Sequence, residues 1–254
     1  MTRRRFDLTD FEWGIIEPLL PNKPRGVPRV DDRRIINGIL WRFRTGSPWA
    51  DVPERYGPPT TCYNRFVRWR KKGVWDDILR EVSKAFDGEI VMIDSSCVRV
   101  HQHAATGKKG DVDDGCMGRS RGGLTTKIHA VVDAEGRPVE LMLTAGQAHD
   151  SKMAEPMLGN IGRGTILLAD RAYDTDALRA LAKAKGAWAN IPAKRNRKDT
   201  FSFSPWVYRQ RNLVERFFNK LKQFRAIATR YDKDPLNFLA AIKLAAARIW
   251  INAL

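Results

Sequence analysis

The sequence predicts an all-helical domain over residues 1–86 and a mixed α/β domain over residues 87–254. Between about residues 6 and 86, apolar side chains recur three and four positions apart, which is the spacing of helices with one buried face. From about Glu89 onward, short apolar runs and alternating segments replace that spacing. This change is typical of strands with helices between them.

Signals for helix ends place three helices in the first domain. Thr9 and Glu12 have the spacing of a capping box at a helix start, and Gly46 is typical of a helix end. The three helices are expected to begin at Thr9, at Asp31 or Asp32, and at Thr61 after the break Gly57-Pro-Pro-Thr-Thr.

The third expected helix, Thr61 to Lys72, is strongly basic. A short helical segment (Pro48 to Tyr56), a turn and a basic helix fit a helix-turn-helix that binds in the major groove of DNA. The pattern also fits a helical bundle with a solvated basic face, and the sequence leaves both interpretations open. The candidate DNA-binding side chains of this helix are Arg65, Arg68, Arg70, Lys71 and Lys72.

The second domain is expected to build one sheet. Three strands form a meander, followed by helix, strand, helix, strand and two last helices, which is the ribonuclease-H-like arrangement of a mixed α/β sheet covered by helices. Residues 104–123 are rich in Gly, Asp and Lys and are expected to form a mobile loop. The expected strands are 89–94 continued over 97–101, then 125–133, 139–144, 165–170 and 187–191, and the expected helices are 151–158, 174–185, about 206–225 and about 235–253.

Composition points to a polyanion as partner. Lys and Arg total 45 against 29 Asp and Glu, a formal net charge of +16, so nucleic acid is favoured over small acidic metabolites. A ribosomal or merely soluble basic protein is the alternative. Three scattered cysteines indicate neither zinc nor disulfides, and the absence of a signal peptide or an apolar run near the ~18 residues of a membrane span leads us to expect a cytoplasmic protein.

Two acids follow apolar runs of the predicted sheet. Asp94 and Asp170 are each expected to end a short strand, and acids at the ends of adjacent strands can meet at the mouth of a site. Two carboxylates that come close repel each other, so a cation or a proton is expected between them. Taken singly, either residue also fits a turn.

A third acid lies on a late helix. Tyr208, Arg211, Glu215 and Lys222 are spaced by three, four and seven residues and share one helix face, within roughly 60° of one another. A surface helix with an ion pair between Arg211 and Glu215 explains the same spacing.

Considered together, the three carboxylates suit magnesium. Two Mg²⁺ ions need hard oxygen ligands and take part of their coordination from substrate phosphate. Two ions ~3.5–4 Å apart would activate the attacking oxygen and stabilise the leaving oxygen of a displacement at phosphorus.

The segment Tyr208-x2-Arg211-x3-Glu215-x6-Lys222 is similar to the signature around the third acid of bacterial insertion-sequence transposases of the DDE class. Further segments resemble the IS-five type of these enzymes, and the resemblance covers essentially the whole chain. These segments are Leu8-Thr-Asp-x-Glu-Trp13, Gly46-x-Pro-Trp49, Ile93 to His103, Gly118 to His129, Gly146-x2-His149-Asp150 and Asp170-Arg-Ala-Tyr-Asp174.

The resemblance implies a bacterial, nucleoid-associated transposase with a ribonuclease-H-like fold. Such an enzyme hydrolyses a DNA phosphodiester to free a 3′-OH and joins this end to target DNA. Its partners would be terminal inverted repeats, target DNA and further copies of the chain, in a dimer or higher assembly. Mg²⁺ is the implied cofactor, with Mn²⁺ as a substitute. The implied catalytic and metal-binding residues are Asp94, Asp170 and Glu215, and the implied DNA-facing residues are Tyr208, Arg211 and Lys222.

Two other functions stay open. A transposase-derived regulator would bind DNA without needing all three acids, and a nuclease of the same fold would cut without joining. Several further residues have bland interpretations beside functional ones. His101 and His103 are expected to alternate along a strand near the site, Asp150 or Ser151 to cap a helix, Asp133 to form a turn, and Asp174 to cap a helix.

Overall fold

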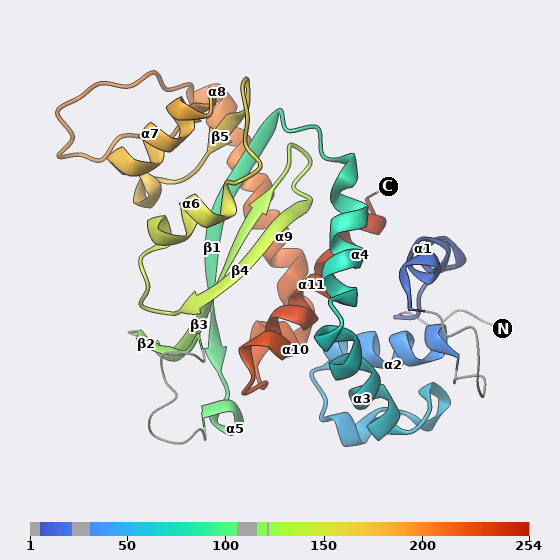
Figure 1. The fold of residues 1–254 in the computed structure, drawn as a ribbon. Coiled ribbons are helices and arrows are strands. Elements are labelled where there is room, and N and C mark those ends of the chain that lie inside the picture. Colours follow the sequence, from blue (N-terminus) through green and yellow to red (C-terminus); the bar gives the residue numbers. More distant parts are fainter. Residues whose placement is uncertain (1–5, 22–30, 106–115, 121, 254) are drawn as a thin grey trace.

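The structure, a computed structural model, describes residues 6–21, 31–105, 116–120 and 122–253. Most of the loop expected over residues 104–123 lies outside this part of the chain. Figure 1 shows a helical region at the N-terminal side and a sheet with helices against it. Both halves of the predicted fold class, helical and mixed α/β, are therefore present.

The N-terminal region is helical, and its helix ends follow the predicted signals. Thr9 and Glu12 form the capping box, with each side chain accepting a hydrogen bond from the other residue's amide. The Asp31 carboxylate caps the next helix, and Gly46 ends it with φ of 75°. The helices are α1 (Asp10–Ile16), α2 (Asp32–Thr45), α3 (Pro59–Lys71) and α4 (Val74–Val82).

Two features of this region differ from the expectation. The segment before α3 forms the 3₁₀ turns η2 (Trp49–Asp51) and η3 (Glu54–Tyr56) rather than a full helix, so the helix-turn-helix assignment stays a prediction. Helix α4 was not predicted. It begins after Gly73, whose φ of 72° allows the chain to turn sharply, and it buries Trp75 and Ile78.

The described strands form one mixed sheet around the long strand β1 (Ile90–Val100). Strand β3 (Gly123–Val132) pairs antiparallel with β1, and β4 (Pro138–Ala145) pairs antiparallel with β3, which confirms the predicted meander. On the other side, β5 (Ile166–Leu168) pairs parallel with β1 and β6 (Trp188–Asn190) pairs parallel with β5. The short strands β2 (Gly118–Ser120) and β7 (Thr229–Arg230) extend the sheet and were not predicted.

Strand β1 is continuous through Asp94, so the expectation that Asp94 ends a strand was wrong. Its pairing with β3 runs without a break from Met92 to Arg99, and Asp94 lies opposite Ala130. Polar residues Ser95 and Ser96 interrupt the apolar run and looked like a strand end. Their backbones nevertheless stay in the sheet because β3 continues beside them.

Helices cover both faces of the sheet (Figure 1). Val91 and Ile93 pack with Met157 and Leu178 on one face, while Met92 belongs to the core on the other face. The helices are α6 (Ala154–Met157) and α7 (Asp176–Ala184) on the first face, α9 (Asn212–Lys222) and α11 (Pro235–Ile251) on the second, and the short α5 (Gln102–Ala105), α8 (Pro205–Tyr208) and α10 (Arg225–Ala228). No helix in the described ranges is long and apolar enough to cross a membrane.

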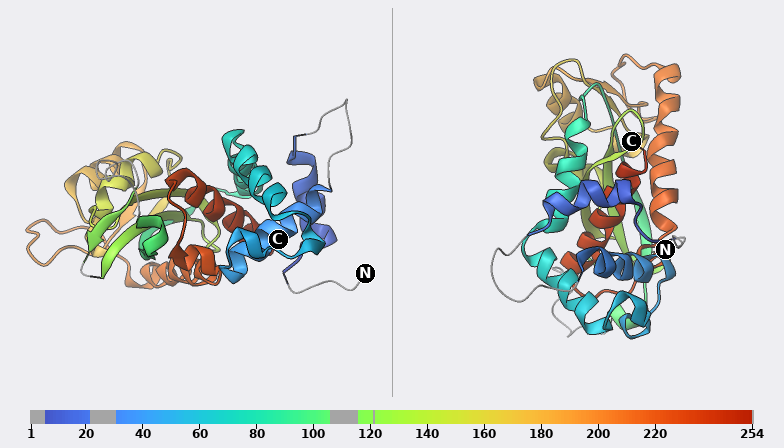
Figure 2. Two further views of the ribbon diagram at one scale, coloured as in Figure 1. Left: turned by 90° about the horizontal axis from the view of Figure 1, so that it is seen from below. Right: turned by 90° about the vertical axis from the view of Figure 1, so that its right-hand side faces the viewer.

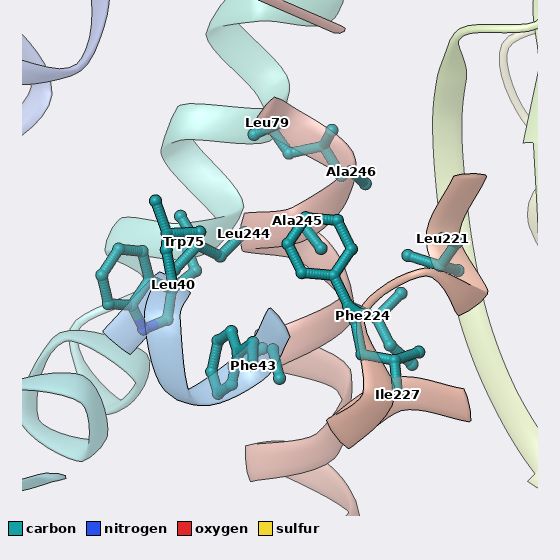
Figure 3. Close-up of a cluster of buried hydrophobic side chains, with 14 of the residues drawn as sticks. Leu40, Phe43, Trp75, Leu79, Leu221, Phe224, Ile227, Leu244, Ala245 and Ala246 are labelled. Atoms are coloured by element: carbon teal, nitrogen blue, oxygen red, sulfur yellow. The ribbon is translucent and has the colours of Figure 1, made fainter. Parts of the chain in front are cut away.

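The core on the α9–α11 face is shared with the N-terminal helices. The C-terminal helices lie between the sheet and α2–α4 (Figure 2), and one continuous cluster of buried side chains joins them. Residues predicted as two domains are thus packed against each other through apolar contacts. Figure 3 shows the contact, with Leu40 and Phe43 of α2 and Trp75 and Leu79 of α4 around Leu244, Ala245 and Ala246 of α11 and Phe224 and Ile227 at α10.

Replacing the buried Leu244 by Ala is expected to lower the free energy of unfolding by about 2–5 kcal/mol, because the truncation leaves a cavity. Since the core is shared, urea unfolding followed by tryptophan fluorescence and by far-ultraviolet circular dichroism should shift together as one transition. Leu236→Ala, at a 57% exposed position of the same helix, should change little. Two transitions, of which only one moves, would show that the helices and the sheet unfold separately.

Candidate catalytic site

Two of the predicted acids lie at the same end of neighbouring parallel strands. The pairing of β1 with β5 ends at Met92 and Leu168, and Asp94 and Asp170 each stand two residues further along. Asp170 accepts a hydrogen bond from the Ala172 amide at 2.8 Å and so starts the 3₁₀ turn η6 (Arg171–Tyr173). The strand topology therefore brings these two carboxylates to one place.

The third acid reaches this place through Arg211. The helix predicted from residue 206 is divided into α8, the 3₁₀ turn η7 (Arg209–Arg211) and α9. One guanidinium N–H of Arg211 donates to Asp94 Oδ2 at 2.7 Å and another donates to Glu215 Oε1 at 2.9 Å. The Arg211–Glu215 ion pair of the alternative interpretation exists, but Arg211 also connects Glu215 to the first acid.

The other two residues of the predicted helix face also lie against this site. Lys222 Nζ donates to Ser96 Oγ at 2.6 Å, and Ser96 stands two residues after Asp94 on the same face of β1. The guanidinium of Arg211 lies 5.9 Å from the centre of the Tyr208 ring. Ser96 was not singled out from the sequence, although its position two residues after the first acid is the signal that could have identified it.

Charge around Asp94 is unevenly balanced. Burial raises the pKa of Asp94, and Asp170 and Glu215 raise it further, while the positive charge of Arg211 opposes them. Burial disfavours the charged carboxylate and nearby negative charges add repulsion. The ionised form of Asp94 is therefore disfavoured even though Arg211 is bonded to it.

The chemistry of these donors fits a divalent cation. Asp94, Asp170 and Glu215 offer carboxylate oxygens, which are the hard ligands that such ions prefer. As the side chains stand, no three His, Cys, Asp or Glu residues in the described ranges are grouped closely enough to enclose an ion. Arg211, bonded to two of the acids, takes the position of their counter-charge.

The basic side chains of α3 divide into two groups. Arg68, Lys71 and Lys72 are exposed. Arg70 pairs with Asp234 at 3.1 Å. Arg65 is only 9% exposed and is bonded to Asp32 of α2, so its inclusion among the DNA-binding candidates needs correction: its guanidinium holds two helices together inside the protein.

The expectation for the histidines near the site was wrong. Strand β1 ends at Val100, and His101 and His103 flank the start of α5, with ring centres 4.7 Å apart. Figure 1 shows α5 at the opposite end of β1 from β5 and α8. These two histidines are therefore remote from the acids.

Three further residues have structural roles. Asp133 forms the predicted turn and accepts hydrogen bonds from the amides of Glu135 and Arg137. Asp174 does not cap α7, which Thr175 caps; it is buried against Arg179 and Arg197. The 3₁₀ turn η5 (Asp150–Met153) is capped by His149 rather than by Asp150 or Ser151.

Most of the chain matches known protein families. Residues 85–250 match the family described as "Transposase DDE domain", and residues 8–79 match "Putative transposase of IS4/5 family". The "Putative transposase for insertion sequence element IS6501" of Brucella ovis is 39% identical over 130 residues, which are 51% of this chain and 100% of that protein. The "Transposase for insertion sequence element IS1106" of Neisseria meningitidis serogroup B is 32% identical over 114 residues, 42% of this chain and 40% of that protein.

The solved structure of a piggyBac transposase synaptic complex with hairpin DNA shares the fold. It aligns with a TM-score of 0.51 over 96% of this chain and 71% of that chain, at 10% sequence identity. The fold is thus the ribonuclease-H-like fold of transposase catalytic domains, as predicted. The chain belongs to the family of transposases with a DDE domain. Membership supports a nucleic-acid-processing enzyme and implies dependence on a divalent metal in general.

Asp94→Asn is expected to stabilise the protein at neutral pH. Because the folded-state pKa of Asp94 is raised above its ordinary value of 3.8, the ionised carboxylate costs stability above the raised pKa, and this cost disappears as the pH falls below 3.8. The Tm advantage of the variant over the parent protein should therefore be largest near pH 7 and vanish toward pH 3.8. A variant that is less stable than the parent at pH 7 would contradict the raised pKa.

Proposed function

We propose that this chain is a DNA transposase that binds the terminal inverted repeats of its element, hydrolyses a phosphodiester to free a 3′-OH and joins that end to target DNA. Asp94, Asp170 and Glu215 are the proposed catalytic residues. The observation that supports the proposal is that Arg211 bonds both Asp94 and Glu215, while Asp94 and Asp170 lie at one end of two parallel strands, in a chain of the DDE family.

The three carboxylates are also the proposed ligands of two divalent cations. Mg²⁺, or Mn²⁺ in its place, would supply Lewis acidity at the scissile phosphate and neutralise charge that develops there. The oxygen-only donor set favours these hard ions over zinc or copper. The protein's part is to present Asp94 and Asp170 from adjacent strands and Glu215 from α9.

Positive side chains beside the acids are suited to the DNA backbone. Arg211 and Lys222 project from one helix face toward β1, and Arg211 has the planar fork that binds phosphate through two hydrogen bonds. We propose that both residues, with Tyr208, contact the DNA strand whose phosphate is cut.

A second DNA contact is proposed for the N-terminal helical domain, residues 1–86. Arg68, Lys71 and Lys72 form an exposed basic end of α3, and the chain as a whole has a net charge of +16. Attraction between such a surface and phosphates releases counterions and supplies affinity for double-stranded DNA. Because two transposon ends must be held together for joining, we propose a dimer or higher assembly as the active form.

Asp94→Asn, Asp170→Asn and Glu215→Gln are each expected to lower the rate of nicking by about a thousandfold or more, since each removes metal-held charge stabilisation of several kcal/mol. The measurement is incubation with DNA flanking the protein's own gene, plus Mg²⁺, followed by mapping of the nicks. Glu155→Gln, at an exposed acid of α6, is the control and should cut normally.

Binding of the three variants to the inverted repeats is measured by mobility shift. Retained binding shows that a variant has lost catalysis rather than DNA binding. Normal nicking by any one of the three variants removes that residue from the catalytic set. A pre-nicked end supplied with target DNA tests joining: products in which the end is covalently attached support a transposase, whereas cutting without such products indicates a nuclease.

Replacing Arg68, Lys71 and Lys72 together by Ala is expected to weaken binding to the repeats. The slope of log K against log salt concentration should shrink by about 0.9 for each phosphate that the variant no longer neutralises. Arg80→Ala, at an exposed side chain of α4 paired with Asp77, removes positive charge elsewhere and should leave the slope unchanged. Arg65→Ala should instead lower Tm, because it removes a largely buried ion pair between α3 and α2.

A further inference from the structure

A polar cluster lies behind the acids, on the opposite face of β1. Ser95 follows Asp94, so its side chain points to the other side of the sheet. There Ser95 Oγ donates to Asp150 Oδ1 at 2.7 Å, and Lys127 Nζ lies 2.8 Å from the same oxygen. Lys127, from β3, shares this face with Ser95. We call Ser95, Lys127, Asp150 and Tyr173 the rear cluster.

Tyr173 connects the rear cluster to the second acid. It is the last residue of η6, the turn that Asp170 starts, and its side chain is fully buried. Its hydroxyl makes no hydrogen bond to any described residue. Burial raises the pKa of Tyr173, and the charges of Asp150, Asp94 and Asp170 raise it further, while the nearby Ser95 side chain lowers it.

The rear cluster is continuous with the acid site through the backbone of Ser95. The Ser95 amide donates to Asp94 Oδ1 at 2.8 Å, while Asp94 Oδ2 accepts a hydrogen bond from Arg211. One unbroken path of hydrogen bonds and ion pairs thus runs from Lys127 through Asp150, Ser95, Asp94 and Arg211 to Glu215.

Asp150 is built to hold its neighbours in place. Burial opposes its ionisation, but Lys127 and Ser95 outweigh burial and keep the pKa of Asp150 below its ordinary value. The backbone around it is fixed, since His149 Nδ1 accepts a hydrogen bond from the Ser151 amide and Lys127 donates to the Ala148 carbonyl at 2.7 Å. A carboxylate already engaged by two donors, across the sheet from Glu215, is poorly placed to bind the same cation.

We propose that Asp150 is a positioning residue: with Ser95, Lys127 and Tyr173 it fixes the backbone at Asp94 relative to Asp170 and thereby sets the affinity of the three-acid site for a divalent cation. This inference rests on the proposed function of those acids. Removing a group that orients a metal ligand typically weakens metal binding by about 10–100-fold. Asp150 therefore matters to the chemistry without touching the reacting atoms.

The test measures Mn²⁺ binding by the full chain without DNA. Binding is detected as a decrease in the electron paramagnetic resonance signal of the free ion. Asp150→Asn and Ser95→Ala should each raise the Kd for Mn²⁺ by about 10–100-fold. Ser95→Ala changes no charge, so its effect cannot arise from weaker long-range attraction of the cation. Ser95→Thr keeps the hydroxyl and should bind nearly as tightly as the parent protein.

Asp133→Asn is the matched control. Asp133 is also a buried, ion-paired aspartate on the same sheet, bonded to Arg137 at the β3–β4 turn. This variant and Asp150→Asn should both lower Tm, but only Asp150→Asn should weaken Mn²⁺ binding. If Asp150→Asn fails to fold, Ser95→Ala decides the question.

The outcomes separate this inference from the function on which it rests. Unchanged Mn²⁺ binding by Asp94→Asn would overturn the proposed metal site itself. If Asp94→Asn loses binding while Asp150→Asn and Ser95→Ala bind as the parent does, the positioning role is wrong. If Asp150→Asn loses binding completely and Ser95→Ala loses none, Asp150 is itself a ligand and the positioning role is again overturned.

Discussion

Along one edge of the long strand β1, two different strands pair with its two ends. The site depends on the segment of β1 that lies between them. Strand β5 pairs with it from Ile90 to Met92, and β7 pairs with Arg99 and Val100. Between these segments no described strand covers that edge, while β3 holds the other edge throughout. A rigid strand is therefore left open on one side where Asp94 lies, and side chains from η6 and α9 can approach it there. Lys222 contacts the carbonyl of Cys97 in this same interval.

The carboxylates around β1 repel one another, and positively charged side chains on both faces of β1 reduce this repulsion. Arg211 on the α9 face compensates Asp94 and Glu215, and Lys127 on the other face compensates Asp150. The compensation is complete at Asp150, whose pKa is lowered, and incomplete at Asp94, whose pKa is raised. The ionised carboxylate is thus favoured at Asp150 and disfavoured at Asp94. A mutation that neutralises Asp94 should stabilise the fold for the same reason.

Local sequence signals predicted the elements well where the relevant interactions are also local. The Thr9–Glu12 capping box, the end of α2 at Gly46 and the meander of β1, β3 and β4 follow from neighbouring residues. The spacing of Arg211 and Glu215 likewise predicted their ion pair. The hydrogen bonds of Arg211 with Asp94 and of Ser95 with Asp150 span 117 and 55 residues, and no helical or strand period reveals such pairs.

The same limit explains the errors. Asp94, Ser95 and Ser96 have the composition of a strand end, but whether a strand continues depends on its neighbour, and β3 supplies one. Arg65 belongs to a basic run in which Arg68, Lys71 and Lys72 are exposed. Its own position on α3 turns it toward Asp32. Counting charges along a helix does not reveal which of them point inward. The helical period assigns a face, and only the packing of α2 against α3 decides whether that face is buried.

Packing also decides how the basic helix relates to the acids. Arg70 of α3 pairs with Asp234, the residue that caps α11, and Arg42 of α2 lies 3.7 Å from Asp232 just before it. Helix α11 in turn contributes to the core that contacts α9 and the sheet. Partly buried ion pairs are costly to break when one partner is removed, so α3 is held to the C-terminal helices by more than apolar contact. A DNA duplex gripped by α3 would thus be positioned against a body that includes the helix of Glu215, because no flexible linker in the described ranges intervenes between those helices and the shared core.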